Sequence, residues 1–129
     1  MLNQTGVTKT TGLSRKTILY DTKLFFALSV IISNTGVEAD SEGKKVIKAG
    51  TPIAGSLTNR DVPFTVAKDT NSTSNAVGIL EHDVDVTGGN ANGSCIVFGF
   101  IDVDKLDAST VALLTDAAKK NLANIQFVK

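Results

Sequence analysis

Tryptophan is absent from the sequence, and cysteine and histidine each occur once. With Cys95 alone, the chain can form neither an internal disulfide nor a zinc site built on cysteines. A single histidine, His82, excludes most catalytic and metal-binding arrangements that rely on this residue type. Because aromatic residues make up only 5% of the chain, a surface on which bases or sugars stack is poorly supplied. These shortages leave few residues for the usual chemistry of enzymes.

The sequence also has no excess of positive or negative charge, since 13 basic residues balance 13 acidic ones. Proteins that bind nucleic acid carry a basic surface, so we expect no nucleic acid as a partner. The densest apolar run, residues 24–32, is less than half the length of a membrane-spanning helix, which needs about 20 residues. We therefore expect neither a membrane anchor nor a secretion signal, and we predict a buried strand at residues 24–32.

The composition that is present fits one globular domain, because 42% of the 129 residues are hydrophobic and 20% are charged. We place this domain at residues 21–129. Residues 1–20 are polar and rich in threonine, and Ile18, Leu19 and Tyr20 are the first that can anchor them. They form either a frayed terminus or a flexible N-terminal arm that orders against a partner, and both interpretations stay open.

The body of the chain is predicted to be mainly β. A tight corner of a small barrel is predicted at residues 46–55, where Gly50 and Pro52 interrupt two short apolar stretches. Residues 69–75 are predicted to form a solvated loop and residues 76–80 a core strand. The alternation of apolar and charged side chains in residues 81–86 predicts a hairpin with residues 94–103, across a turn at 87–93.

A single helix is expected late in the chain, capped by Asp107 or Ser109. Its apolar stripe consists of Val111, Leu114, Ala118 and Leu122. Residues 125–128 are predicted to form a final strand.

Few side chains suggest chemistry. The carboxylates that could hold calcium are Asp83, Asp85, Asp102, Asp104 and Asp107. They lack the twelve-residue loop of a calcium site, so a solvated strand face is the favoured interpretation. A pair of Cys95 and His82 across the hairpin is conceivable, but it has neither an orienting third residue nor an oxyanion hole. We therefore expect that the protein is not an enzyme and that it binds neither a metal ion nor a cofactor.

Several segments in the second half resemble phage head proteins. Residues 76–80 (AVGIL) and 82–86 (HDVDV) resemble the centre of tailed-phage capsid decoration proteins. Residues 99–106 (GFIDVDKL) resemble the matching segment of head fibre proteins from Gram-positive hosts, and residues 117–120 (AAKK) and 125–129 (IQFVK) continue the likeness. Upstream, residues 48–53 (KAGTPI) also fit, so the resemblance covers the chain from about Val46 to its end.

This resemblance implies a lambda-type head decoration fold: a small β-barrel or β-tulip-like domain, here with one C-terminal helix and an extended N-terminal arm. It further implies a homotrimer, assembled in the host cytoplasm, that binds the major capsid protein on the outer surface of the virion after the shell expands. Such cementing proteins have no catalytic residues. By position, the arm would contact the capsid, with Thr5, Thr8, Lys9, Thr10, Ser14, Arg15 and Lys16 as its candidate contact residues.

Two other functions are weighed against capsid decoration. The alternative is a head-fibre base or an adhesion module that recognises cell-wall glycan on the host surface, and the low aromatic content argues against it. An enzyme that uses His82 and Cys95 comes third.

Overall fold

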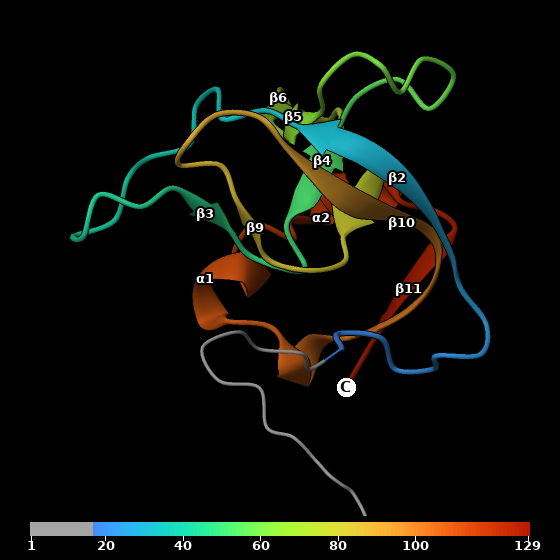
Figure 1. Ribbon diagram of the computed structural model, residues 1–129. Helices are drawn as coiled ribbons and strands as arrows, with labels where there is room; N and C mark the ends of the chain where they lie inside the picture. Colours follow the sequence, from blue (N-terminus) through green and yellow to red (C-terminus); the bar gives the residue numbers. More distant parts are fainter. Residues whose placement is uncertain (1–16) are drawn as a thin grey trace, which may run out of the picture.

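The computed structural model describes residues 17–129, which form a mainly β fold (Figure 1). The largest sheet has the strand order β11-β10-β8-β4-β5, and β2 also pairs with β10. Its strands are β2 (Phe26–Ile32), β4 (Pro52–Ala54), β5 (Thr65–Val66), β8 (Gly78–Leu80), β10 (Ala91–Asp102) and β11 (Ile125–Val128). Two small ladders join β3 (Val46–Ile47) to β9 (Val84–Asp85) and β6 (Asp69–Thr70) to β7 (Thr73–Ser74).

The twelve-residue strand β10 organises the sheet. One of its edges pairs antiparallel with β2, and a bulge between Ile96 and Phe98 shifts the register. Its other edge pairs antiparallel with β8 and then parallel with β11, where Ile101 lies opposite Phe127. The two end strands, β11 and β5, do not pair with each other, so the sheet is open and the expectation of a small barrel is wrong.

Hydrophobic cores pack on both faces of the sheet because successive strand side chains point to opposite faces. The first core cluster contains Ile18, Leu19, Ala76, Ile79, Ile96, Ile101, Leu114, Ala118, Leu122 and Ile125. The second core cluster contains Val30, Ile32, Ile47, Ile53, Phe64, Leu80, Val84, Val86 and Cys95. Neighbouring β10 residues thus serve different clusters, Ile96 the first and Cys95 the second.

The predicted hairpin between residues 81–86 and 94–103 is wrong in its partner. Cys95 lies opposite Leu80 of β8, whereas β9 turns away and pairs with β3. Residues 91–93, expected in the turn, instead begin β10 and pair with β2. Apolar–polar alternation determines which side chains face a core, but it does not specify the neighbouring strand.

The single expected helix is divided into two short ones, α1 (Ala108–Val111) and α2 (Asp116–Asn121), which follow the 3₁₀ helix η1 (Val103–Lys105). The division occurs because Thr115 has an extended backbone and its side chain accepts a hydrogen bond from the Ala118 amide, which starts α2. Leu114, Ala118 and Leu122 are buried as the apolar stripe predicts.

Of the other local predictions, one is confirmed and two are confirmed in part. The final strand at 125–128 is confirmed as β11. The solvated loop at 69–75 contains a small exposed hairpin, β6–β7, with Asn71 and Ser72 at positive φ in its turn. The strand at 24–32 is confirmed as β2, but its complete burial is not, because Leu24 and Phe26 are exposed.

The N-terminal side of the described chain is fixed to the body. Leu19 forms an isolated antiparallel bridge with Ile101, in which Tyr20 N donates to Phe100 O and Asp102 N to Ile18 O, each at 2.9 Å. Ile18 and Leu19 are buried in the first core cluster, so these residues of the expected arm belong to the domain. Within residues 17–129, no helix has the length and apolar character needed to cross a bilayer.

Candidate functional site

The expected capsid-contact residues lie in the N-terminal arm. All of them, Thr5, Thr8, Lys9, Thr10, Ser14, Arg15 and Lys16, fall outside the described residues. The remaining candidates lie in the domain and can be placed.

Cys95 and His82 occupy different environments. Cys95 is fully buried in the second core cluster, and this burial raises the pKa of its thiol to about 11. A thiol with such a pKa is protonated at neutral pH and is a poor nucleophile. The His82 side chain lies at the surface, with Nε2 3.5 Å from Oε2 of Glu81. The geometry therefore does not assemble a thiol–imidazole pair.

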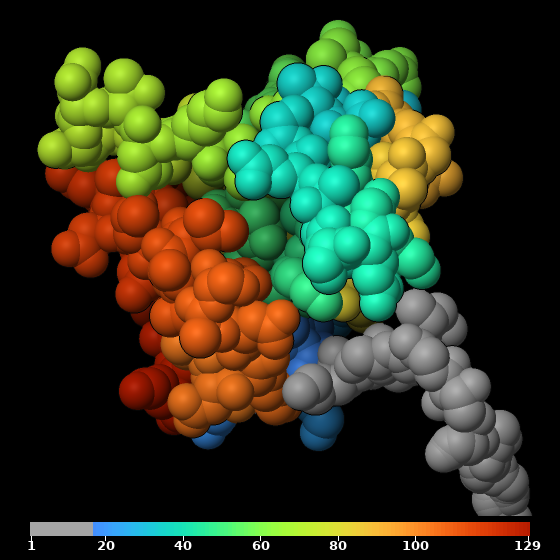
Figure 2. All heavy atoms as spheres, turned by 90° about the vertical axis from the view of Figure 1, so that its left-hand side faces the viewer, coloured from blue at the N-terminus to red at the C-terminus, as the bar shows by residue number. Residues whose placement is uncertain are grey.

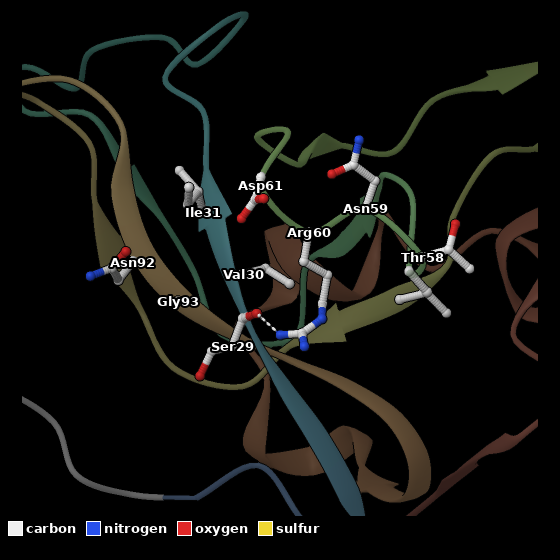
Figure 3. Close-up of a pocket in the computed structure, with 10 residues that line it drawn as sticks. Ser29, Val30, Ile31, Thr58, Asn59, Arg60, Asp61, Asn92 and Gly93 are labelled. Atoms are coloured by element: carbon white, nitrogen blue, oxygen red, sulfur yellow. Dashed lines mark hydrogen bonds between the residues drawn. The ribbon is translucent and has the colours of Figure 1, made fainter.

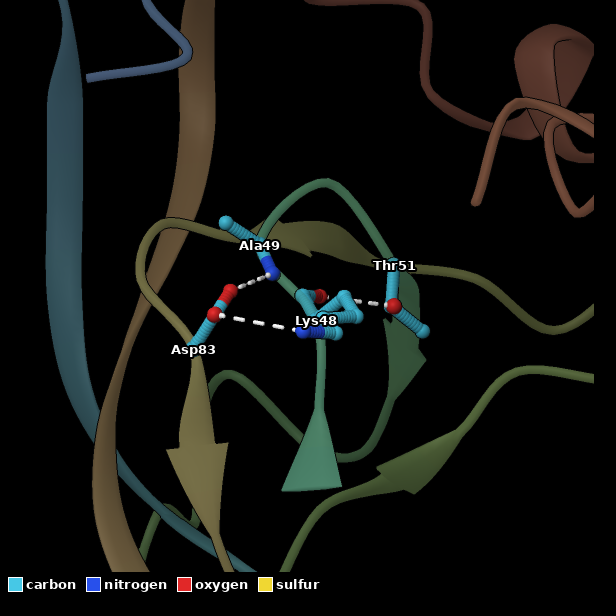
Figure 4. Close-up of polar contacts among 4 residues, drawn as sticks. All are labelled: Lys48, Ala49, Thr51 and Asp83. Atoms are coloured by element: carbon cyan, nitrogen blue, oxygen red, sulfur yellow. Dashed lines mark hydrogen bonds and ion pairs between the residues drawn. The ribbon is translucent and has the colours of Figure 1, made fainter. Parts of the chain in front are cut away.

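Asp83 holds a turn together. One of its carboxylate oxygens accepts a hydrogen bond from the Ala49 amide at 2.7 Å, and the other lies 3.8 Å from Lys48 Nζ (Figure 4). Thr51 Oγ1 donates to the Lys48 carbonyl in the same turn, at 2.7 Å. The carboxylate thus connects the turn before β4 to the segment between β8 and β9.

The other carboxylates of the expected acidic face also have local partners. Asp85 accepts hydrogen bonds from the side chain and the amide of Thr87, and these bonds lower the pKa of its carboxyl group. Asp102 accepts from the Asp104 amide and caps η1. Among residues 17–129, no three His, Cys, Asp or Glu side chains gather closely enough to hold a metal ion. These aspartates shape turns rather than a common site.

A polar groove of about 600 Å³ lies beside β2 (Figure 3). Its walls are formed by residues 29–31 of β2, Asn92 and Gly93 of β10, and the loop at 57–61. Arg60 Nη1 donates to the Ser29 carbonyl at 2.7 Å, so the guanidinium covers a backbone acceptor of β2. No residue that lines the groove is aromatic, and the groove therefore lacks the stacking surface typical of a glycan site.

A second hollow, of about 680 Å³, is apolar. It lies between the segment at 37–48 and α1, on the face that Figure 2 presents, where this segment is cyan to teal and α1 is orange. Its apolar lining residues are Val37, Ala39, Val46, Ile47, Val66 and Leu113.

An exposed apolar surface forms where β2 begins. Phe26 of β2 lies opposite Phe98 of β10, and their side chains are 56% and 42% exposed. Leu24, two residues before Phe26, is 52% exposed. We call these three residues the aromatic patch. Large side chains that remain in contact with water on two paired strands are typical of a surface that binds another protein.

The sequence carried a signal for this patch that our prediction of a buried strand did not use. Phe25 and Phe26 are adjacent, and consecutive strand residues point to opposite faces. Phe25 packs against the first core cluster, and Phe26 is therefore turned to the other face.

Comparison with protein families and with curated proteins identifies no relative of this chain. No protein-family model matches the chain, and no curated protein matches it in sequence.

Proposed function

We propose that the protein is a virion structural protein that binds the outside of a phage capsid as a homotrimer and stabilises or decorates the head. The observation that carries this proposal is the aromatic patch, which offers an apolar surface to another protein. Cys95, by contrast, is buried, and the acidic side chains Asp83, Asp85 and Asp102 serve turns. A binding role fits these residues better than a catalytic one.

The arrangement of the resembling segments supports the proposal further. Residues 48–53 lead into β4, residues 76–80 include β8, residues 99–106 include the end of β10, and residues 125–129 include β11. These four strands are consecutive neighbours in the sheet. A resemblance to a folded unit should fall on elements that pack together, and these four segments do. The other two lie outside the sheet: residues 82–86 include β9 of a separate ladder, and residues 117–120 lie in α2.

The arm supplies the second part of the proposed mechanism. Residues 1–16 contain Lys9, Arg15 and Lys16 and no acidic residue, and they join the domain beside the buried Ile18. An extended segment can add a strand to a sheet edge of the capsid protein, where its backbone supplies the hydrogen bonds. Many modest contacts repeated over a symmetric shell give a large collective stabilisation.

The test is a truncation that removes only the arm. Deleting residues 1–16 should abolish co-sedimentation with expanded heads and leave the circular dichroism spectrum unchanged. The full-length protein should bind expanded heads and not immature ones. Binding of the truncated protein at full strength contradicts the role of the arm, and failure of the full-length protein to bind expanded heads contradicts the proposed function.

A longer deletion serves as the control for folding. Removing residues 1–20 also removes Ile18 and Leu19 from the first core cluster and breaks the bridge to Ile101. The loss of two large buried side chains costs several kcal/mol, roughly 2–5 for each. This variant should therefore show a large decrease in melting temperature, which the 1–16 deletion should not.

A further inference from the structure

We propose that copies of this chain associate with one another through the aromatic patch of Leu24, Phe26 and Phe98. This inference deepens the proposed function, because it names the surface that would hold the homotrimer together. It rests on the geometry, the charge and the surroundings of the patch.

The patch is held on a firm support. Phe26 and Phe98 are direct partners in the antiparallel β2–β10 ladder, so their side chains lie next to each other. The residues on either side of Phe26, Phe25 and Ala27, pack against the first core cluster. Because these two neighbours anchor the backbone, Phe26 is presented in a fixed position, and little backbone freedom is lost when a partner covers it.

The two strand segments that carry the patch contain no charged residue. Residues 24–32 and residues 91–101 contain no Asp, Glu, Lys or Arg. Cores of protein interfaces are depleted in charged residues and enriched in aromatic ones, because burial of an unpaired charge is costly. Among the described strands β2 pairs with β10, and its far edge is bridged at Ile32 by Phe64 and covered at Ser29 by Arg60. The start of β2, where Phe26 lies, bears none of the lysines or prolines that commonly guard an edge strand.

The rim of the patch indicates that the partner is a second copy. Asp21 and Lys23 lie just before Leu24 and bear opposite charges. The Asp21 carboxylate accepts a hydrogen bond from the Lys23 amide at 2.8 Å, which holds the two residues close together. A rim with both signs is complementary to a copy of itself, whereas a partner with a field of one sign finds no match. Near a threefold axis, one such patch can meet both neighbouring copies.

The decisive variant is Phe26→Ser with Phe98→Ser in the full-length chain. The wild-type mass, measured by light scattering and sedimentation equilibrium, should be a multiple of 13.5 kDa, and the variant should dissociate to the single-chain mass. We expect its association constant to fall by about a hundredfold or more, since each truncated aromatic residue is at the centre of the contact. The matched control is Leu57→Ser with Val62→Ser, which removes two exposed apolar side chains from a loop and should leave the mass unchanged.

A second experiment keeps the inference testable if the double variant does not fold. In Phe26→Cys, mild oxidation should produce covalent dimers, whereas Val62→Cys at the control position should not. The native Cys95 is buried and does not compete. A single-chain mass for the wild-type protein overturns the inference, as does a folded double variant that keeps the wild-type mass or a Phe26→Cys variant without cross-links.

The outcome for the proposed function is read separately, from binding to expanded heads. A double variant that keeps its mass but no longer binds heads would assign the patch to the capsid protein. That result overturns self-association through the patch and supports decoration. A wild-type protein that forms trimers through the patch but does not bind heads supports self-association and contradicts decoration.

Discussion

Replacement of Gly78 by alanine should destabilise the protein by about 3 kcal/mol, at the upper end of the usual cost of overpacking a core. Gly78 lies in β8, between β4 and β10 in the sheet. A Cβ atom at this position would overlap the Cys95 Sγ and lie 2.7 Å from the Ile96 carbonyl oxygen. The carbonyl belongs to the neighbouring strand, so the clash cannot be relieved by rotation of a side chain alone.

The assay is urea unfolding followed by circular dichroism, at one fixed protein concentration because association adds to apparent stability. The matched control is Gly88→Ala. An added Cβ at Gly88 meets no atom within 4 Å, and the backbone of Gly88 is outside the positive-φ region. We expect the control to change the free energy of unfolding by no more than about 0.5 kcal/mol.

A double-mutant cycle then tests the contact itself. Cys95→Ala removes the Sγ that the new methyl group would overlap. In the Cys95→Ala background, the destabilisation caused by Gly78→Ala should therefore be smaller by at least about 1 kcal/mol. The clash with the Ile96 carbonyl should persist in both backgrounds. If the two substitutions are additive, or if Gly78→Ala is neutral, Gly78 does not face Cys95. The observed pairing of β8 with β10 would then be refuted.

Two further predictions concern a thiol and a helix cap. The free energy of unfolding should fall by roughly 2–3 kcal/mol between pH 9 and pH 11, because the buried Cys95 thiol, with a pKa of about 11, keeps its proton when the unfolded thiol has lost it. Cys95→Ala should lack this component in alkaline urea titrations, and equal slopes for the two proteins would contradict the burial of the thiol. Thr115→Ala should cost about 1 kcal/mol, because the side chain accepts from the Ala118 amide at 3.1 Å and donates to Asp69 at 2.6 Å. An unchanged urea midpoint would show that the cap contributes nothing.

Local sequence signals predicted the elements whose character depends on their own residues. The β-branched residues of β2 and β11 favour strands, and both strands form where they were expected. The spacing of Leu114, Ala118 and Leu122 identified the buried side of the C-terminal helical region. The break before α2 was missed because the apolar stripe continues across it. Thr115, a preferred N-cap residue, and Asp116 in the first turn are signals of a new helix start that our prediction did not use.

Strand pairing was not predictable from the same signals. The alternation in residues 81–86 requires only that the apolar side chains reach a core, and pairing with either β10 or β3 can meet this requirement. In the structure, β9 pairs with β3, and Val84 and Val86 lie in the second core cluster. The observed arrangement requires a small residue at Gly93, where an added Cβ would lie 2.8 Å from the Ile32 side chain. That glycine allows β10 to continue past its predicted start and to occupy the edge of β2. Such a close approach between distant segments leaves no local pattern.

Whether a strand side chain is exposed depends on how the other elements pack against its face of the sheet. Phe26 and Phe98 have the composition of core residues. The adjacency of Phe25 and Phe26 indicates that the two point to opposite faces, but the assembled sheet is needed to show which of them remains in contact with water. Conversely, Asp83 and Asp85 were correctly predicted to be exposed, but their hydrogen bonds to Ala49 and Thr87 required the fold.

The pairing at Ile101 has a practical consequence for engineering. Leu19 lies on one side of this residue and Phe127 on the other, and their segments run in opposite directions. The chain therefore enters and leaves the domain at the same end, whereas the loop at 56–61 lies at the opposite end (Figure 1). A circular permutant that joins these neighbouring ends would need only a short linker. If the protein decorates a head as proposed, a cargo fused after Lys129 would crowd the side from which the arm departs, and a peptide meant for display belongs in the 56–61 loop.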